Sequence, residues 1–532
     1  MRTAPFTTTY AGRGMVCAVD HLAAEAGVGV LRSGGNAVDA AIATSAVLAV
    51  TTQHMCGLGG DLWALVHEPG QRAPYAVNAS GRAGSGADAD RLRAEGHDTM
   101  PRFDDIRAVP VPGCVDGWCL LSERFGRLPL GDVLAPAISY AAEGFPASPT
   151  LARAAPAVAD RPGGEAFRAA THPGAVVRRP GVARTLAAVA ADGRAAFYEG
   201  EFGDGLLALG SAGDGKPEYA VDDLARCQAD LVAPLELTSW GRRLWTVPPN
   251  SQGYLSLAAS WIAAGLPLPD DPDDARWAHL TVEAARLASY DRYDVLHEHA
   301  DGAALLAESR LAPRRDRISP DRAASLPDER YAGGGTIYLC TVDADRMGVS
   351  LIQSNAAGFG VGIAEPSTGI FLQNRGIGFS LEPGHSAEYG PGRRPPHTLS
   401  PALVTTDDDA LDMVIGTMGG DTQPQIILQL LARLLRGSDD VGSAIAAPRW
   451  ALSAAPPGGT GFDTWQSRGA VRVHLEDHAP AAWDRLSAFG HDVERHPPLG
   501  YNVGHAHVIA VRGEALEGAS DPRALAGRAA GW

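Results

Sequence analysis

Three consecutive glycines at residues 333–335 stand directly before Thr336 in the stretch YAGGGTIYLCTVDADRMGVSLIQSN. Thr336 opens a run rich in β-branched and aromatic residues, which is typical of a β-strand. The polar, proline-containing residues before the glycines predict an exposed, flexible linker over about residues 300–335. A linker that runs straight into a core strand suits a chain that is cut immediately before Thr336.

The residue types at this junction are suited to such a cut. Glycine tolerates strained backbone geometry and leaves its carbonyl accessible, so the Thr336 hydroxyl could attack the Gly335 carbonyl. The acyl group would shift from nitrogen to oxygen, and water would release a new N-terminus at Thr336. A simpler interpretation stays open on these residues alone: the glycines form a loop, and Thr336 is an ordinary strand residue.

Hydrophobic patterns predict helices mainly before Thr336 and strands mainly after it. Residues 33–50 read as a buried helix, with Asn36 as the N-cap and Asp39 near the positive end of the helix dipole. Further helices are expected at residues 184–193, ended by Gly193, and at residues 279–293. Strands are expected at residues 336–343, 347–354, 402–406 and 507–513.

Length and charge restrict the class of partner. A chain of 532 residues can form several domains or one large layered core. The formal net charge of −17 argues against binding nucleic acid or an anionic membrane surface, because both need a basic face. The sequence has neither a signal-peptide pattern nor an apolar run of about 18 residues. We therefore expect a cytoplasmic protein with a small-molecule partner and no membrane contact.

Several catalytic classes lack their required residues. Lys216 is the only lysine among 45 basic residues, and it lies in a Gly/Pro-rich loop, which argues against a P-loop and against Schiff-base chemistry. The motifs GxSxG and HExxH are absent. The six cysteines include no CxxC pair and are expected to be reduced and mostly buried: Cys17, Cys56, Cys114, Cys119, Cys227 and Cys340.

Two His-x-His pairs are the candidate metal ligands. Residues two apart share a face on a strand but not on a helix, so His505 and His507 could point the same way, whereas His297 and His299 are less suited. Neither pair has a carboxylate or a third histidine at ligand spacing. We therefore predict neither a metal site nor a cofactor.

A series of motifs runs in order along nearly the whole chain. The first part contains HLAAEAGVGVLRSGGNAVDAAIATS, GLGGDLWALVH, VPGCVDGW, LAPAISYAAEGF and PPNSQGY. The second part contains TIYLCTVDADRMGVSLIQSN, STGIFLQNRGIGFS, RPPHTLSPALV, GTMGGDTQPQ, APRW and GASDPR. With these motifs the sequence resembles the γ-glutamyltransferase family of N-terminal-nucleophile hydrolases.

The resemblance implies an α/β fold, a four-layer αββα sandwich, made as one chain and cut autocatalytically between Gly335 and Thr336. The large part, residues 1–335, and the small part, residues 336–532, would form one intertwined domain. Thr336 would be the nucleophile, with its own α-amine as the base. Ser354 falls where the family places a second hydroxyl. Gly419 and Gly420 fall where backbone N–H groups form the oxyanion hole.

The substrate-binding positions depart from those of γ-glutamyltransferases proper. Arg375 stands where the first acid of an ammonium-binding pair belongs, and Gly378 stands at the second acidic position. Arg82 is displaced by about two positions from an arginine that grips the α-carboxylate, and Ala356 replaces an asparagine. A Ser-Ser pair is replaced by His397 and Thr398. The residues implied in substrate binding are Arg82, Asn355, Asn374, Arg375, His397 and Thr398.

This charge reversal points to an acyl group that carries a carboxylate and no ammonium, since arginine binds carboxylates bidentately. The segments QNRG and HTLSPAL are similar to those of glutaryl-type cephalosporin acylases and oxamate amidohydrolases. We expect an amidohydrolase or acylase. A γ-glutamyltransferase or γ-glutamyl hydrolase and an unprocessed, non-catalytic family member remain as alternatives. The expected partners are the amide substrate and the two parts of the precursor, and a homo-oligomer stays open.

Overall fold

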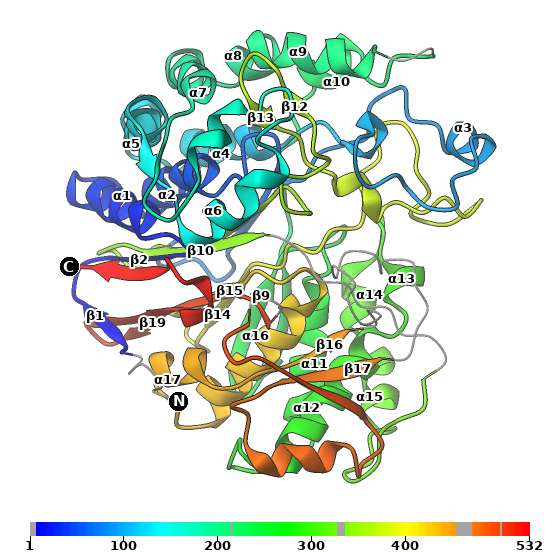
Figure 1. Cartoon of the computed structure of the whole chain (residues 1–532). Coiled ribbons are helices and arrows are strands. Elements are labelled where there is room, and N and C mark those ends of the chain that lie inside the picture. Colours follow the sequence, from blue (N-terminus) through cyan, green and yellow to red (C-terminus); the bar gives the residue numbers. More distant parts are fainter. Residues whose placement is uncertain (1–6, 213–214, 327–335, 454–470, 501–502) are drawn as a thin grey trace.

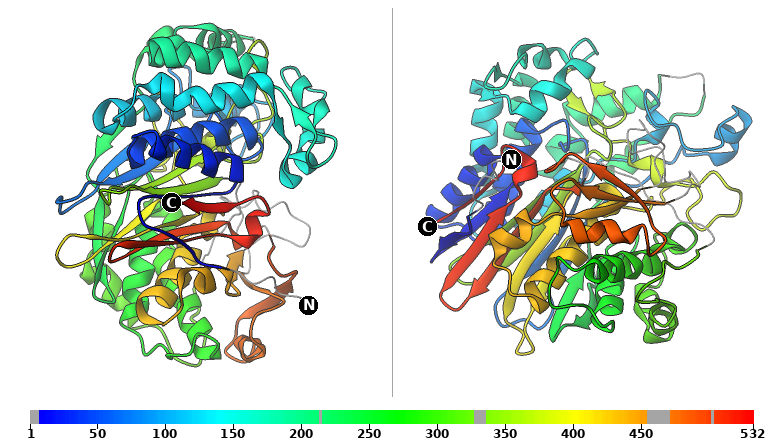
Figure 2. Two further views of the ribbon diagram at one scale, coloured as in Figure 1. Left: turned by 90° about the vertical axis from the view of Figure 1, so that its left-hand side faces the viewer. Right: turned by 60° about the horizontal axis from the view of Figure 1, so that its bottom comes forward.

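Two seven-stranded sheets lie face to face at the centre of the fold, and helices cover the outer side of each sheet (Figure 1). The computed structural model describes residues 7–212, 215–326, 336–453, 471–500 and 503–532. Figure 2 shows the same order of layers from the side: helices, sheet, sheet, helices. The chain thus has a mixed α/β fold.

Neighbouring strands are antiparallel in both large sheets. The first sheet has the spatial order β21 (Arg528–Gly531), β2 (Met15–Ala18), β10 (Ile337–Val342), β11 (Gly348–Ser354), β3 (Asp61–His67), β4 (Tyr75–Ala79), β7 (Asp230–Val232). The second has the order β1 (Thr9–Ala11), β20 (Ala515–Ser520), β19 (Ala506–Arg512), β15 (Leu411–Thr417), β14 (Ala402–Thr405), β9 (Arg242–Thr246), β8 (Leu235–Ser239).

Segments from both sides of Thr336 share these sheets. In the first sheet, β10 and β11 follow Thr336 and lie between β2 and β3, which precede it. In the second sheet, β9 precedes Thr336 and pairs with β14, which follows it. The two parts of the chain are therefore interleaved strand by strand. The division of the chain at residues 335 and 336 stays a prediction.

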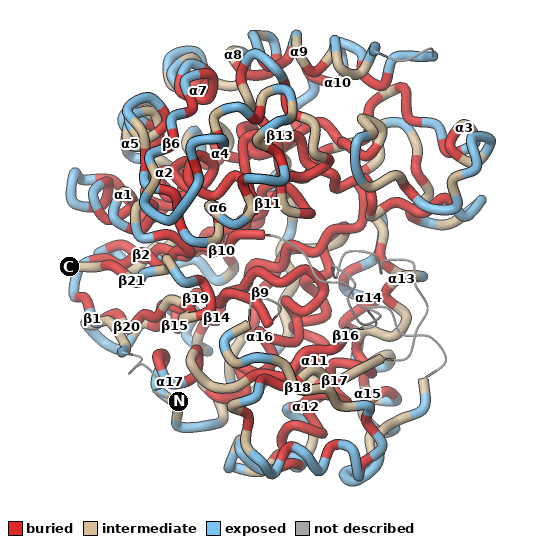
Figure 3. The backbone as a smooth tube through the Cα atoms, viewed as in Figure 1, coloured by how far each residue is buried: buried red, intermediate tan, exposed pale blue. Residues whose placement is uncertain are grey.

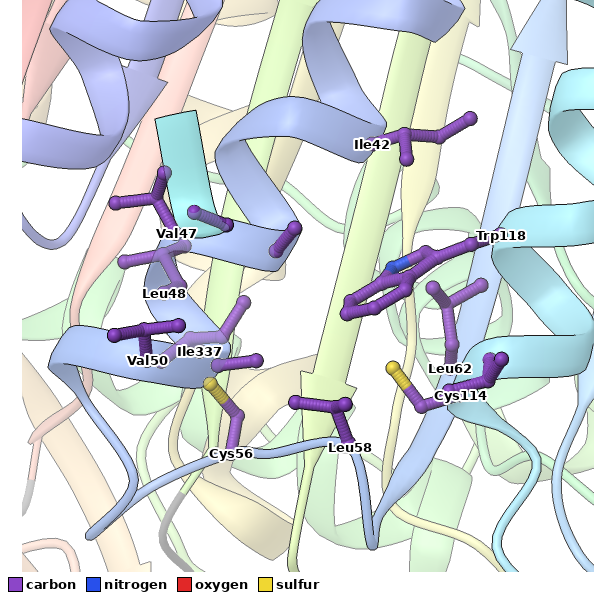
Figure 4. Close-up of a cluster of buried hydrophobic side chains, with 14 of the residues drawn as sticks. Ile42, Val47, Leu48, Val50, Cys56, Leu58, Leu62, Cys114, Trp118 and Ile337 are labelled. Atoms are coloured by element: carbon purple, nitrogen blue, oxygen red, sulfur yellow. The ribbon is translucent and has the colours of Figure 1, made fainter. Parts of the chain in front are cut away.

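Helices pack on the outer faces through apolar surfaces. The first sheet is covered by α1 (His21–Arg32), α2 (Ala37–Thr51) and α4 (Cys114–Phe125), while α5 (Leu130–Glu143) packs on α2 and α7 (Pro180–Asp192) packs on α5. The second is covered by α11 (Tyr254–Ala264) and α16 (Gln423–Leu431), and α12 (Ala275–Ser289) packs on both of these helices. Every residue of α2 is buried (Figure 3). Figure 4 shows side chains of α2 packed with Leu62 of β3, Trp118 of α4 and Ile337 of β10.

The space between the sheets forms a separate apolar layer that includes Trp63, Trp245, Tyr338 and Leu403, all buried. Burial of aromatic and aliphatic surface on both sides of each sheet is the main stabilising contribution. Because β10 lies in the middle of the first sheet, a residue at its start is fixed by packing on both faces.

The predicted elements are confirmed with small shifts at their ends. Asn36 caps α2 by accepting hydrogen bonds from the Val38 and Asp39 backbone N–H groups, both at 3.0 Å, and Asp39 accepts one from the Asn36 N–H at 2.9 Å. Helix α7 ends before Gly193, whose φ of 67° suits glycine. Helix α12 and strands β10, β11, β14 and β19 occupy the other predicted segments. Four of the six free cysteines are buried, and Cys227 is exposed.

The predicted linker differs from the structure in its first half. Residues 302–315 form two helices, α14 (Gly302–Leu306) and α15 (Glu308–Arg315), with Leu305, Leu306 and Leu311 packed into the core. Arg310 and Arg314 lie one turn apart and both bind Asp291. The polar composition of this stretch thus reflects an ion-paired helix face. The later residues 327–335 lie outside the described part of the chain.

Smaller elements complete the fold. A three-stranded sheet contains β16 (Trp450–Ser453), β17 (Arg472–Glu476) and β18 (Asp492–His496). Two-stranded sheets form from β5 (Phe145–Pro146) with β6 (Val176–Val177), and from β12 (Ala364–Glu365) with β13 (Ile370–Phe371). The remaining short helices are α3 (Ala89–Ala94), α6 (Pro149–Ala154), α8 (Arg194–Tyr198), α9 (Glu201–Gly210), α10 (Val221–Ala225), α13 (Arg292–Val295) and α17 (Val441–Ala446). Among the described residues, none of the helices has the length and apolar character needed to cross a bilayer.

Candidate active site

Thr336 lies immediately before β10 and is buried, with 1% of its surface exposed. The antiparallel register that pairs Ile337 with Gln353 brings the next residues of the two strands, Thr336 and Ser354, side by side. Their hydroxyl oxygens are 3.1 Å apart, within hydrogen-bond distance. The structure therefore places the predicted nucleophile and the predicted second hydroxyl together. Gly335, the other side of the predicted cut, lies outside the described residues.

The Ser354 hydroxyl is the centre of a small network. Its oxygen accepts a hydrogen bond from the Ala356 backbone N–H at 2.8 Å and one from Arg375 Nη2 at 3.1 Å. Ala356 has a φ of 72°, in the left-handed region that non-glycine residues seldom adopt. The hydrogen bond to Ser354 holds this strained turn at the end of β11. Ser354 thus fixes both the chain after β11 and the arginine near Thr336.

Arg375 is a buried cation beside the predicted nucleophile. It begins the 3₁₀ turn Arg375–Gly378 and is 3% exposed. Nη1 donates to Thr398 Oγ1 at 3.1 Å, and Nε has no hydrogen-bond partner among the described residues. Burial lowers the pKa of Arg375 to about 10, although the charges of Asp61 and Asp421 oppose this shift. No described carboxylate forms a salt bridge with this guanidinium, so its charge is available to an anionic ligand.

Close packing, which the sequence did not reveal, explains why residue 378 is a glycine. A Cβ atom at this position would stand 2.5 Å from the backbone oxygen of Pro396. By the family resemblance, Gly378 stands at an acidic position that has lost its side chain. In this fold no side chain fits there without a shift of the backbone near Pro396, so the absence of an acid follows from close packing.

His397 is held by Asp61 rather than open to a ligand. Both side chains are fully buried, with His397 Nε2 and Asp61 Oδ2 2.9 Å apart. His397 Nδ1 accepts a hydrogen bond from the Leu399 backbone N–H at 3.3 Å, so Nε2 carries the proton and donates to Asp61. Burial, and then the charge of Arg375, lowers the pKa of His397 to about 4. The imidazole is therefore neutral near pH 7.

The predicted oxyanion-hole glycines form a sharp turn after β15. Gly419 has φ 141° and ψ 15°, and Gly420 has a φ of 58°. The first conformation is essentially restricted to glycine, and the second costs other residues about 1 kcal/mol or more. Both residues are needed for the backbone path, which then enters α16.

Buried polar side chains hold this turn. Gln252 Nε2 donates to the carbonyl of Gly420 at 2.9 Å and to that of Thr398 at 3.1 Å. Gln252 Oε1 accepts from Arg292 Nη1 at 2.7 Å, and Arg292 forms a buried ion pair with Asp421 at 2.7 Å. Because Thr398 also binds Arg375, one continuous network joins the glycine turn to Ser354 and Thr336.

The remaining predicted binding residues make hydrogen bonds or ion pairs with other parts of the chain. Asn374 binds the Ala357 N–H and the Arg102 carbonyl, both at 3.0 Å. Asn355 donates to the Gln53 carbonyl at 3.0 Å. Arg82 is paired with Asp230 at 2.8 Å. Their participation in substrate binding stays a prediction.

Sequence reasoning missed four residues of this network: Asp61, Gln252, Arg292 and Asp421. Gln252 and Asp421 lie inside quoted motifs, PPNSQGY and GTMGGDTQ, so their position was visible but not their role. Asp61 also lies inside a quoted motif, GLGGDLWALVH, whereas Arg292 lies in none, and both residues have partners that are distant in sequence. Burial of charged side chains is what identifies them.

The two histidine pairs differ in burial. His505 and His507 are buried, and burial lowers their pKa values to about 4 and about 3. His299 is exposed, and His297 is half-buried. Within the described part of the chain, neither pair belongs to a cluster of three metal-ligating side chains.

Comparisons with known proteins find similar sequences and structures over nearly the whole chain. The sequence model of the gamma-glutamyltranspeptidase family matches residues 23–532. The chain is 37% identical to the oxamate amidohydrolase proenzyme of Klebsiella pneumoniae over 98% of both sequences. It is 30% identical to the glutathione hydrolase proenzyme of Pseudomonas aeruginosa, over 97% of this chain and 94% of that one. The crystal structure of cephalosporin acylase from Bacillus halodurans superposes with a TM-score of 0.89 and 33% identity, covering 100% of this chain and 99% of that one.

The structure thus has a buried threonine at the start of a central strand, with a second hydroxyl beside it and a guanidinium bound to that hydroxyl. The protein belongs to the gamma-glutamyltranspeptidase family. It is a hydrolase of that family that acts on amide bonds.

Proposed function

We propose that the protein is an autoprocessing N-terminal-nucleophile amidohydrolase whose nucleophile is Thr336 and whose substrate is the amide of a short acyl group ending in a carboxylate. One observation carries this proposal: Arg375, Ser354 and Thr336 form a chain of two hydrogen bonds, each 3.1 Å long. Through these two hydrogen bonds a buried positive charge lies close to the hydroxyl that would react.

The arrangement of layers supports the processing step. Helices enclose two stacked antiparallel sheets, as expected for the αββα class, and Thr336 opens a central strand. The Klebsiella relative is named a proenzyme. Cleavage before Thr336 would give this residue a free α-amine, whose ordinary pKa is about 7.7–8, so a useful fraction is unprotonated near neutral pH. The amine then stands next to the hydroxyl that it must deprotonate.

The proposed reaction has two steps, acylation of Thr336 and hydrolysis of the resulting ester. The α-amine takes the proton from Thr336 Oγ1 as this oxygen bonds to the amide carbonyl carbon. The carbonyl oxygen becomes an oxyanion, which the backbone N–H groups of Gly419 and Gly420 would stabilise. The ammonium returns its proton to the leaving nitrogen as the C–N bond breaks and leaves an ester on Thr336. Water attacks the ester, the amine accepts its proton, and the acid is released as the hydroxyl is restored.

Arg375 would bind the carboxylate of the acyl group. Its Nε–H has no partner among the described residues, and the guanidinium edge offers parallel donors for a carboxylate. A substrate α-ammonium would instead meet a like charge in a buried site, which is unfavourable. This contrast supports carboxylate-bearing amides over γ-glutamyl amides.

The short distance from Arg375 to the nucleophile favours a short acyl group. Two hydrogen bonds of 3.1 Å leave Arg375 Nη2 and Thr336 Oγ1 no more than about 6 Å apart. A hydrogen bond from Arg375 to the substrate carboxylate takes up about 2.8 Å, and the approach of Thr336 Oγ1 to the amide carbon takes up about 3 Å. Together these two distances nearly equal the separation of Arg375 Nη2 and Thr336 Oγ1. The two carboxyl carbons are about 1.5 Å apart in an oxamate-type substrate and about 5 Å apart in an extended glutaryl group. Of these acyl groups, the oxamate type has to bend least to contact Arg375 and Thr336 at the same time. The name of the Klebsiella relative, an oxamate amidohydrolase, supports this choice.

A series of amides with increasing chain length tests this proposal. Ammonia release would be measured from oxamate, succinamate, glutaramate and γ-glutamyl amide with the processed protein and with Arg375→Gln. We expect kcat/KM to fall along the series and the preference to collapse in Arg375→Gln. A parent enzyme that prefers the γ-glutamyl amide would overturn the proposal and favour the glutathione hydrolase type of activity found in the Pseudomonas relative.

A further inference from the structure

The outer face of the small sheet carries three metal-ligating side chains. Strands β17 and β18 are parallel, and their register pairs His474 with Glu494. His496 lies two residues beyond Glu494 and therefore on the same face. Val473 and Leu475 alternate with these residues and are packed into the core. The polar face thus results from a half-buried strand pair that directs its ionisable side chains outward.

The three side chains converge. His474 Nδ1 lies within contact distance of His496 Nε2. Glu494 Oε2 is 4.0 Å from His474 Nδ1, and Glu494 Oε1 is 3.8 Å from His496 Nε2. One ligand atom from each residue lies within 4.8 Å of the others. The side chains of Glu494 and His496 are 42% and 38% exposed, so an ion can reach them from solvent.

We propose that His474, Glu494 and His496 bind a divalent transition-metal ion of the Zn²⁺ class. Two imidazole nitrogens and one carboxylate oxygen are donors that Zn²⁺ prefers, with bonds of about 2.0–2.2 Å. An ion placed between donors that already lie this close needs only side-chain rotation. A water molecule would complete a tetrahedral site.

Arg472 shares the carboxylate of Glu494 without excluding the ion. Its Nη1 donates to Glu494 Oε2 at 3.2 Å, and its Nε donates to Asp492 at 2.8 Å. Glu494 Oε1, the oxygen nearer His496, does not take part in this pair. Arg472 can therefore orient the carboxylate from behind while the other oxygen binds the metal.

The bound ion would fasten an outer strand to the molecule. The chain between β17 and β18 passes through the 3₁₀ helix Ala481–Leu486, where Trp483 stacks on Trp277 of α12 at 6.0 Å. Strand β18 lies at the edge of its sheet and is held by β17 on one side. A metal bridge across the two strands would stabilise this segment without contacting the Thr336 network.

Metal binding to the dialysed full chain tests the inference. Titration with Zn²⁺ would be followed by calorimetry, and Co²⁺ binding by visible absorption, for the parent and for His474→Ala and His496→Ala. We expect about one equivalent bound by the parent and at least about 10-fold weaker binding in either variant. Zn²⁺ should raise the Tm of the parent but not that of the variants, and amide hydrolysis should be unchanged.

Two control variants separate this site from other donors. His299→Ala removes an exposed histidine elsewhere, and Cys227→Ser removes an exposed thiol. Both should bind Zn²⁺ as the parent does. The inference is overturned if the parent binds no stoichiometric metal, or if His474→Ala and His496→Ala retain its affinity. If only Cys227→Ser loses binding, the metal is held by the thiol and the inference also fails.

Discussion

Arg375 donates a hydrogen bond to the Ser354 hydroxyl at 3.1 Å, and that same hydroxyl lies 3.1 Å from Thr336 Oγ1. The Ser354 hydroxyl therefore links Arg375, which would bind the carboxylate of the acyl group, to Thr336, which would attack the amide. A substitution at any of the three residues is therefore expected to change catalysis, but for a different physical reason in each case.

Replacing Thr336 by alanine should abolish both self-cleavage and hydrolysis, because the variant has no hydroxyl to attack the preceding carbonyl or the substrate. Intact mass should show one chain of 55.4 kDa, whereas the parent should give two pieces, with the smaller one starting at Thr336. Thr336→Ser keeps the hydroxyl and should still be cut. N-terminal sequencing that finds a different start, or activity in Thr336→Ala, would contradict the assignment.

Removing the Ser354 hydroxyl should slow maturation and turnover by about 10-fold, since one hydrogen bond of about 0.5–1.5 kcal/mol is lost at the proposed nucleophile, Thr336. Ser350→Ala is the matched control. It lies on the same strand and loses a comparable hydrogen bond, to Tyr338 OH at 2.9 Å, away from Thr336. Single-turnover rates and Tm would be measured for both. Equal rate losses in the two variants would remove Ser354 from the site.

Arg375→Gln should lower kcat/KM on carboxylate-bearing amides by about 10- to 150-fold, the effect of losing a charge-assisted hydrogen bond of about 1.5–3 kcal/mol. Stability should not fall, because Arg375 is buried without a described carboxylate partner and its removal leaves no unpaired charge. Arg523→Gln is the contrasting control. Arg523 is buried between Glu476 and Asp521, and its loss should cost about 3–5 kcal/mol. A large loss of Tm in Arg375→Gln would indicate a structural role instead.

Local sequence patterns predict the two strands, β10 and β11, at whose ends Thr336 and Ser354 lie.

 
Thr336 lies immediately before β10 and Ser354 ends β11, and these two strands are neighbours in sequence, so a short antiparallel connection is enough to bring the two residues together. The capped helix α2 was likewise predictable, because Asn36 and Asp39 determine its start within four residues. Interactions of this short range are encoded in the residues that make them.

Long-range contacts could not be predicted in this way. Asp421 and Arg292 are 129 residues apart, and Asp61 and His397 are 336 apart, so only the assembled sheets bring these pairs together. The packing that excludes a side chain at Gly378 also depends on a distant segment. The helices within residues 302–315 were missed because their charged residues, which pair with Asp291, resemble those of a solvated linker.

Gly419→Ala should lower kcat by about 10²- to 10³-fold with a smaller change in KM, because it displaces a predicted oxyanion donor. The φ of 141° is not accessible to alanine without strain, and the added Cβ would collide with Thr422 Oγ1. Gly29→Ala is the control, since a Cβ on this residue of α1 meets no atom within 4 Å. Steady-state kinetics should show normal activity for Gly29→Ala. Normal kcat in Gly419→Ala would exclude the turn from the oxyanion hole.

Lowering the pH should destabilise the fold, partly because His507 is buried in its neutral form. Burial lowers the pKa of His507 to about 3, below its ordinary value of about 6.5, so the unfolded chain binds a proton that the folded chain rejects. The free energy of unfolding should therefore fall as the pH decreases from about 6.5 toward 3, by up to about 1.4 kcal/mol per pH unit for this group. Urea unfolding at pH 7, 6 and 5 would measure the slope. In His507→Asn the slope should be shallower, even if the variant is less stable at pH 7, whereas the exposed control His299→Asn should keep the slope of the parent. An unchanged slope in His507→Asn would show that this histidine does not contribute to acid sensitivity.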